Sequence, residues 1–305
     1  MADLFPIIAS RILPRLGQSP GLDGGVRTWF LRGSYIGGID PITGNVVLSN
    51  VHMSELVEYF AFDFERFCLS SLESFYVSKS DFDSNGFISW PLLKLYYSAF
   101  FSAHAIMRAT GCAIVKIERE QIDAINMMVQ TTTGTSPRLK PGMFRCTLRE
   151  VMPGQNELVI SSPSDGVGVH DAFWKTFCDY LDEIAETAVQ NGSPDASQFV
   201  AGISNLSPKL RGWLSARRND INYQQLFGVW YPLSCGRKIK NYVSLVGKIK
   251  SKSVNINMDT TKTIECFIRV SQFMACLNVD IGDYVCARSS ATRAFGSRWK
   301  RFPNF

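Results

Sequence analysis

The residues best suited to chemistry lie in the stretch Leu210–Tyr223, which reads LRGWLSARRNDINY. A helix over this stretch would carry a stripe of four apolar side chains: Leu210, Trp213, Leu214 and Ile221. Arg217 falls within that stripe, and Arg218 lies at its edge, one turn before Asn222. Burying a guanidinium beside apolar groups is costly unless an anion meets it, so the pattern predicts an anion-binding site.

A simpler interpretation of the same residues stays open. Arg217 and Asp220 are three positions apart, the spacing of a surface ion pair worth on the order of a few tenths of a kcal/mol. Arg218 could likewise donate to the carbonyl groups of a neighbouring loop. In that case the stretch would be structural and would bind no ligand.

The composition is that of an ordinary globular chain. The 305 residues are 46% apolar and 19% charged, enough for a sizeable core, and 21 Phe favour an aromatic-packed, mostly helical interior. The net charge of +5 is compatible with a polyanionic partner. Pro6, Arg11 and Pro14 interrupt a signal-peptide pattern, and no run reaches the roughly 18 apolar residues of a membrane span. We expect a cytoplasmic protein without membrane contact.

Cysteine and histidine usage argues against several site types. None of the eight Cys is spaced as C-x-x-C, so we expect buried free thiols and neither a zinc site nor another metal. There is no P-loop and no G-x-S-x-G motif, and we expect no cofactor. Of the three His, we expect His52 and His170, at two helix starts, to be structural or solvated, and His104 to be a hydrogen-bonded core residue.

Hydrophobic periodicity predicts a helical protein. Helices are expected over 54–77, ended by the polar loop 78–86, and over Trp90–Thr110, with Gly111 as its stop. The stretch 112–137 is ambiguous: residues 114–130 can form a helix, followed by a polar break over 131–137. Further helices are expected over His170–Val189, 196–206 and Asp259–Leu277. The helix Trp90–Thr110 is apolar nearly all round, as a central helix would be. It carries a seam of small residues where another helix could approach closely: Ser98, Ser102, Ala105 and Ala109.

Two β-hairpins are expected, over 26–51 and 143–161, because turn-forming residues separate apolar runs there. Residues 1–25 are expected to form an irregular surface arm, and the tail after Cys286 to be basic and partly extended. The predicted organisation is a single domain over 1–305: an N-terminal arm and hairpin (1–53), a helical core with a hairpin insertion (54–230), and a basic C-terminal helical extension and tail (231–305).

Basic residues near the C-terminus are candidates for nucleic-acid binding: Arg237, Lys238, Lys240, Lys248, Arg298, Lys300 and Arg301. Four aromatic residues lie among them and could stack on bases: Tyr242, Phe295, Trp299 and Phe302. A solvated basic face without a ligand is the alternative.

Two stretches together resemble a known family. LKLYYSAFFSAHAIMRATG is similar to the helix of the HEPN superfamily (higher-eukaryote and prokaryote nucleotide-binding domains), which typically carries a YYAxFH-like run, and RRNDINY is similar to the second signature of that family. The resemblance covers about 50 residues and implies a mainly α, HEPN-like helical bundle with one or two β-hairpin insertions, usually dimeric. It also implies a metal-independent endoribonuclease or toxin-type effector of a prokaryotic anti-phage (abortive-infection) defence system, acting on RNA as a homodimer or with a partner defence protein.

Carried over residue by residue, the resemblance makes Arg217 or Arg218 the phosphate-stabilising group and Asn219 the following polar residue, with Asn222 and Tyr223 in the region of the family's His. Here that His is absent, and Phe101 stands in place of the His of the YYAxFH run. Asn is no base, and Tyr with a pKa of about 10 is a poor one. Catalysis would therefore be slow and positional, or would take its base from another chain. The alternative is an inactive HEPN-like module that binds nucleic acid, a nucleotide or a protein.

Overall fold

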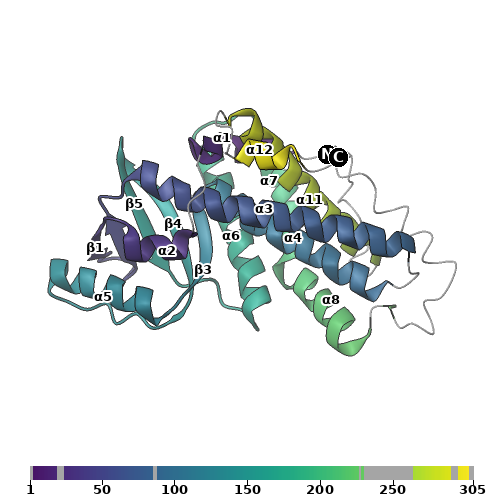
Figure 1. Ribbon diagram of the computed structural model, residues 1–305, viewed down its shortest axis with the longest axis horizontal. Coiled ribbons are helices and arrows are strands. Elements are labelled where there is room, and N and C mark those ends of the chain that lie inside the picture. Colours follow the sequence, from purple (N-terminus) through teal and green to yellow (C-terminus); the bar gives the residue numbers. More distant parts are fainter. Residues whose placement is uncertain are drawn as a thin grey trace.

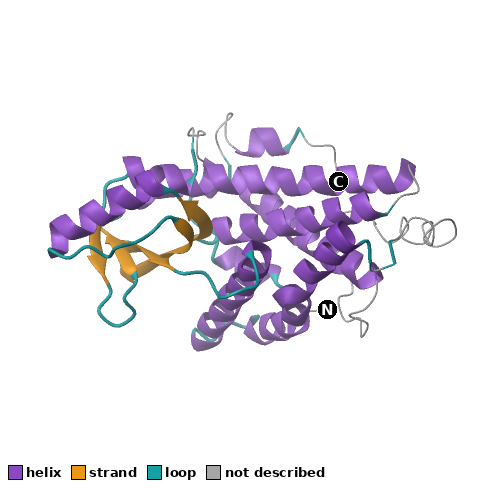
Figure 2. Ribbon diagram, turned by 90° about the horizontal axis from the view of Figure 1, so that it is seen from below, coloured by secondary structure: helices purple, strands orange, loops and turns teal. Residues whose placement is uncertain are grey.

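The computed structural model describes residues 3–18, 24–84, 88–226, 228–229, 264–289 and 295–301. Helices dominate this part of the chain, and its strands form one five-stranded antiparallel sheet toward one end of the molecule (Figures 1 and 2). The expected mainly α fold class is confirmed. The elements are α1 (Phe5–Ser10), η1 (Leu16–Gln18), α2 (Val26–Arg32), β1 (Ile36–Ile39), β2 (Val46–Ser49), α3 (Met53–Ser84), α4 (Ser89–Ala109), β3 (Cys112–Ile117), α5 (Arg119–Thr133), β4 (Gly142–Met152), β5 (Gln155–Ser161), α6 (Val169–Gln190), α7 (Ala196–Lys209), η2 (Leu210–Leu214), α8 (Ser215–Asn219), η3 (Asp220–Gln224), α11 (Ile264–Ala287) and α12 (Phe295–Trp299).

Helix α4 is central, as predicted, and packs against both α3 and α11. The seam of small residues lies against α3, where the Ser71 hydroxyl is 2.7 Å from that of Ser102 and 3.3 Å from that of Ser98. Small side chains let the two backbones approach, and the buried hydroxyls satisfy one another. Gly111, at φ 85°, adopts the left-handed conformation that ends the helix.

Helix α3 buries the aromatic stripe predicted for 54–77, but the predicted polar loop 78–86 is wrong. The helix continues to Ser84 because this segment still has a buried face. Phe82 lies two turns after Phe75 and is buried, and the Ser78 hydroxyl donates to the Pro91 carbonyl at 2.6 Å. The polar composition of the segment reflects only its solvent-facing side.

The two predicted hairpins exist but are not separate insertions. Strand β2 pairs with β5, which gives one sheet with the order β1-β2-β5-β4-β3. The possible helix over 114–130 is partly wrong, because Cys112–Ile117 forms the edge strand β3 beside β4. Helix α5 begins only at Arg119, where the side chains of Glu118 and Gln121 form a reciprocal capping box with the backbone.

The N-terminal expectations are corrected in two places. The segment Val26–Arg32, expected as a strand, is helical because Val26, Trp29 and Phe30 share one buried face at i, i+3, i+4 spacing. The segment expected as a surface arm contains α1, whose Ile7 and Ile8 are buried in the main core and which contacts α11.

The C-terminal segment also belongs to the core. Helix α11 continues to Ala287, beyond the predicted end at Leu277, and the predicted start at 259–263 lies outside the described residues. The tail is not extended at Phe295–Trp299, which forms α12. Phe295 and Trp299 are 3% and 4% exposed, so they serve packing, and the prediction that they stack on bases is wrong.

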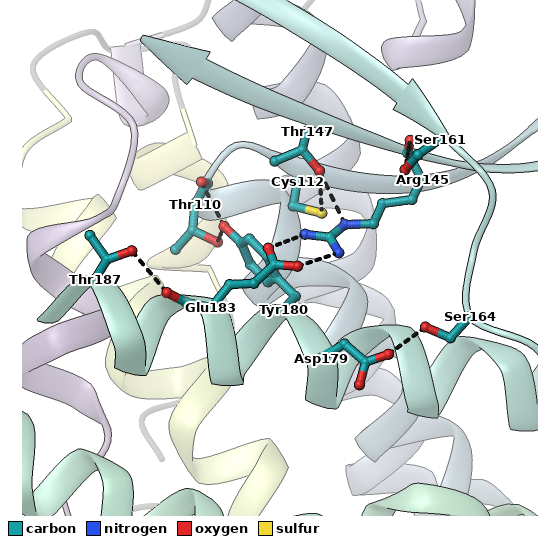
Figure 3. Close-up of polar contacts among 10 residues, drawn as sticks. All are labelled: Thr110, Cys112, Arg145, Thr147, Ser161, Ser164, Asp179, Tyr180, Glu183 and Thr187. Atoms are coloured by element: carbon teal, nitrogen blue, oxygen red, sulfur yellow. Dashed lines mark hydrogen bonds and ion pairs between the residues drawn. The ribbon is translucent and has the colours of Figure 1, made fainter. Parts of the chain in front are cut away.

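A polar network ties the sheet to α6 (Figure 3). The Arg145 guanidinium on β4 forms a two-pronged ion pair with Glu183 on α6, one prong at 2.8 Å, and lies over the Tyr180 ring. The Tyr180 hydroxyl donates to the Thr110 carbonyl at the end of α4 at 2.9 Å. The network thus fixes α6, which carries part of the candidate site, relative to α4. Within the described part of the chain, no helix has the length and apolar character needed to cross a bilayer.

Candidate functional site

The two stretches that carry the family resemblance contact each other. Arg218 on α8 donates from Nη2 to the Tyr97 hydroxyl on α4 at 2.9 Å, although 121 residues separate the two in the chain. The guanidinium also lies over the Tyr97 ring, 5.9 Å from its centroid. The two stretches therefore form one site.

An interruption of the helix at Arg211 and Gly212 orients the residues that follow toward α4. The single helix expected over Leu210–Tyr223 is wrong, because Arg211 and Gly212 have non-helical dihedrals and Gly212 takes φ 70°. The Arg211 guanidinium binds Asp179 at 2.6 Å and Asp182 at 2.7 Å, which clamps η2 to α6. Because the helix restarts after this clamp, Arg218 faces the core instead of Arg217.

The surroundings of Arg218 are polar and aromatic. Its Nη1 donates to Asn219 at 2.9 Å and lies 3.4 Å from the Tyr223 hydroxyl. The wide, π-type turn η3 brings the fifth residue after Arg218 over the guanidinium, so the centroid of the Tyr223 ring lies 5.3 Å from the guanidinium carbon. Such turns recur at functional sites. Asn222 is half-buried and makes no hydrogen bond to Arg218.

Hydrogen bonds fix the guanidinium of Arg218, but one of its buried N–H donors has no partner in the described residues. Arg218 is only 9% exposed, and no hydrogen-bond partner within the described residues reaches its buried Nε. Burial alone would lower the pKa of this arginine, but the Tyr97 and Tyr223 hydroxyls outweigh burial and raise it. A fixed cation beside the exposed Tyr223 ring suits an anionic ligand.

Arg217 has a different environment. Its Nη1 lies 3.0 Å from Asp220 in the i, i+3 ion pair that was the simpler interpretation of the sequence. Its side chain is 32% exposed, so solvent screens the pair. Of the two arginines, Arg218 is therefore the better candidate for ligand binding.

His170, which was expected to be structural or solvated, lies beside the residues that contact Arg218. The Trp174 indole donates to the Tyr96 hydroxyl at 3.1 Å, and this hydroxyl is 2.9 Å from His170 Nδ1. The imidazole also packs edge-on against the Tyr97 ring that Arg218 covers. Tyr96 thus engages Nδ1, and no hydrogen bond within the described residues engages Nε2. His170 thus places an imidazole beside the Tyr97 ring, although RRNDINY itself contains no histidine.

The charge state of His170 follows from its surroundings. Burial, and then the positive charge of Arg218, lower the pKa of His170 below its usual value. The imidazole is therefore neutral at pH 7, the form in which a ring nitrogen can accept a proton. No sequence signal connects His170 to Arg218, because both approach Tyr97 only once η2 is clamped to α6.

We expect the His170 pKa, measured by NMR titration of its ring protons, to lie below the usual histidine value of about 6.5, because burial and the charge of Arg218 both lower it. In Arg218→Gln the His170 pKa should rise, because the variant removes the cation while burial remains. Arg119→Gln, which removes an exposed charge on α5, serves as control and should leave it unchanged. An identical His170 pKa in Arg218→Gln and wild type would show that the two groups do not interact.

Of the predicted basic nucleic-acid contacts, the three that the structure describes do not lie at this site. Arg237, Lys238, Lys240 and Lys248 lie outside the described residues, as do Tyr242 and Phe302. Arg298, on α12, forms a two-pronged ion pair with Glu65, while Lys300 and Arg301 beside it are exposed. In Figure 1, α12 lies at the top and α8 at the bottom, so these three residues are on another surface.

Cysteine and acidic residues form no further candidate centre in the described ranges. Cys68, Cys112, Cys146, Cys178, Cys266 and Cys276 are buried free thiols, as predicted, whereas Cys286 is half-buried. No group of three or more His, Cys, Asp or Glu side chains is placed there to hold a metal ion. Comparisons of the whole chain with protein-family models, with curated proteins and with solved structures found no match.

Proposed function

We propose that this protein is an endoribonuclease of the HEPN-like type in which Arg218 and His170 perform metal-independent RNA cleavage. The observation that carries the proposal is the convergence of Arg218 and His170 on the Tyr97 ring. One group is a cation fixed by Tyr97 and Asn219, and the other is an imidazole whose pKa is lowered by its surroundings. These are the two functions that cleavage of RNA by its own 2′-hydroxyl requires.

In the proposed reaction, the 2′-oxygen bonds to the adjacent phosphorus while the bond from phosphorus to the 5′-oxygen breaks. In the tautomer that carries its proton on Nδ1, His170 takes the 2′-hydroxyl proton at Nε2 and returns that proton to the leaving 5′-oxygen. Arg218 stabilises the charge that develops on the phosphorane oxygens. The products are a 2′,3′-cyclic phosphate and a 5′-hydroxyl end. Tyr223, which is 71% exposed beside Arg218, offers a ring on which an unpaired base can stack.

The direct test incubates purified protein with total RNA and with tRNA in EDTA and maps the ends produced. We expect 2′,3′-cyclic phosphate ends, and a rate that falls roughly 10²–10³-fold in Arg218→Ala because transition-state charge loses its partner. Arg119→Ala, which also removes an exposed positive charge, should cleave at the wild-type rate. Cleavage by Arg218→Ala at that rate would contradict the proposal.

A second candidate function is binding without cleavage. It is favoured by the contacts that already occupy two nitrogens of Arg218, which leave less of the guanidinium for a transition state. Intact RNA together with salt-sensitive binding of a single-stranded oligonucleotide, lost in Arg218→Ala, would support this function over the first. Toxicity on expression in bacteria, abolished by Arg218→Ala, would support the toxin-type role that the family resemblance implies.

A further inference from the structure

A second cationic site lies beyond the C-terminal end of α4. A surface cavity of about 360 Å³ lies between the Gly24–Gly25 turn, α3, the last turn of α4 and the edge strand β3. In Figure 1, α2 and β3 lie to the left of α8, so this cavity is on a different part of the molecule from Arg218. Its volume falls in the range that holds small-molecule ligands.

The lining of the cavity is strongly positive. Four of its side chains are cationic and one is anionic: Arg27, Arg66, Arg108, Lys116 and Asp63. The Asp63 carboxylate is already engaged, because it accepts from the Val26 N–H at 3.1 Å and from Arg66 Nη2 at 3.0 Å. Lys116 pairs with Glu118 in an exposed salt bridge. The remaining positive charge favours an anionic ligand.

Arg108 gives this cavity an unsatisfied buried donor. The residue is 2% exposed; its Nη1 binds His104 at 3.0 Å and its Nη2 donates to the Ile114 carbonyl at 2.7 Å. Its Nε has no hydrogen-bond partner in the described residues, since Asp63 is 3.9 Å away. A buried donor left unpaired is costly, so a ligand that accepts from Nε would relieve that cost.

The edge strand β3 contributes backbone donors. The Ile114 carbonyl accepts from Arg108 and therefore points away from β4, toward the free edge of the sheet. Backbone groups alternate in direction along a strand, so the N–H of Lys116, two residues later, points to the same edge. A main-chain N–H beside several guanidinium groups is a combination that matches phosphate oxygens.

We propose that this cavity binds a small phosphorylated ligand, with Arg108 and Arg66 contacting its phosphate and Arg27 and Lys116 contributing at the rim. Phosphate is favoured over a single carboxylate because four cationic side chains surround the cavity and because forked guanidinium donors match tetrahedral oxyanions. This binding site is independent of RNA cleavage at Arg218.

Isothermal titration calorimetry with inorganic phosphate, pyrophosphate and AMP tests the proposal on the full chain. At least one of these probes should bind, and Arg66→Gln and Arg27→Gln should each weaken binding roughly tenfold. Both side chains are exposed, so these variants should fold. Arg119→Gln, on the neighbouring helix α5, is the charge-matched control and should bind as wild type does.

Several outcomes would overturn this inference. Absence of binding heat for all three probes at millimolar concentration would do so, as would binding unchanged in both Arg66→Gln and Arg27→Gln. Equal binding of acetate would show that the cavity does not select phosphate. Complete displacement of bound pyrophosphate by a short RNA would assign the cavity to RNA. Loss of pyrophosphate binding in Arg218→Ala would contradict the independence of the two sites, which predicts unchanged binding in that variant.

Discussion

His170→Asn is expected to lower the rate of RNA cleavage by roughly 10²–10⁴-fold while leaving the protein folded. The asparagine amide can keep the hydrogen bond that His170 Nδ1 shares with the Tyr96 hydroxyl at 2.9 Å, but it cannot accept or return a proton at neutral pH. The loss should appear in kcat, because the variant removes proton transfer and retains the arginine that holds the phosphate. Binding of an RNA blocked by 2′-deoxy substitution at the cleavage site should therefore be unchanged.

His52→Asn is the matched control, because His52 precedes α3 as His170 begins α6, but His52 is exposed. Its substitution should leave cleavage at the wild-type rate. The wild-type rate should increase with pH and level off below the usual histidine pKa, because burial and Arg218 lower the pKa of His170 and a general base acts when deprotonated. If His170→Asn cleaves within about threefold of wild type, the base is another group.

The sequence predicts local structure well where one periodicity dominates. The stripe that includes Phe60 and Phe64 predicts α3, and the small residues of α4 predict a close helix contact, since both depend on neighbours in the chain. The helix α2 is missed because Trp, Phe and Val also suit strands and only packing against α3 decides between the two. The strand β3 is missed because its identity depends on pairing with β4, about 30 residues later.

The candidate site is likewise predictable only where it depends on residues close together in the sequence. The sequence identifies RRNDINY as unusual and pairs it with the α4 stretch, and the contact between Arg218 and Tyr97 brings the two together. It gives no means of choosing Arg218 over Arg217, because the choice depends on the break at Gly212 and on the wide turn at Tyr223. His170 could not be predicted either, because its position near Arg218 is fixed by tertiary contacts of α6.

Arg108→Ala is expected to cost about 3–5 kcal/mol of the free energy of unfolding, the largest loss of stability among the arginines that the structure describes. The variant leaves three buried groups without their partner: His104 Nδ1, the Ile114 carbonyl and, in part, the Asp63 carboxylate.

Because arginine only donates, the bond at 3.0 Å requires His104 Nδ1 to carry a lone pair. Burial, and then Arg108, lower the pKa of His104 well below its usual value. This agrees with the predicted core histidine.

Arg66→Ala is the control, since Arg66 contacts the same carboxylate. The Asp63 carboxylate lies 3.0 Å from Arg66 and 3.9 Å from Arg108, so distance alone would assign the larger effect to Arg66. Burial reverses this order: the Arg66 side chain is 58% exposed and that of Arg108 is 2% exposed. An ion pair at the surface is screened by solvent and contributes about 0–1 kcal/mol to the free energy of unfolding. Breaking a buried pair costs more, because it leaves a charge that is neither hydrated nor paired.

Urea unfolding followed by circular dichroism measures both losses, and equal m-values would show that the denatured states are comparable. Arg108→Lys, which keeps the charge but loses the fork that reaches His104 and Ile114 together, should fall between wild type and Arg108→Ala. If Arg108→Ala does not fold, the loss in Arg108→Lys must still exceed that in Arg66→Ala. Equal losses in those two variants would show that Arg108 is a replaceable charge and does not link α4 to the sheet edge.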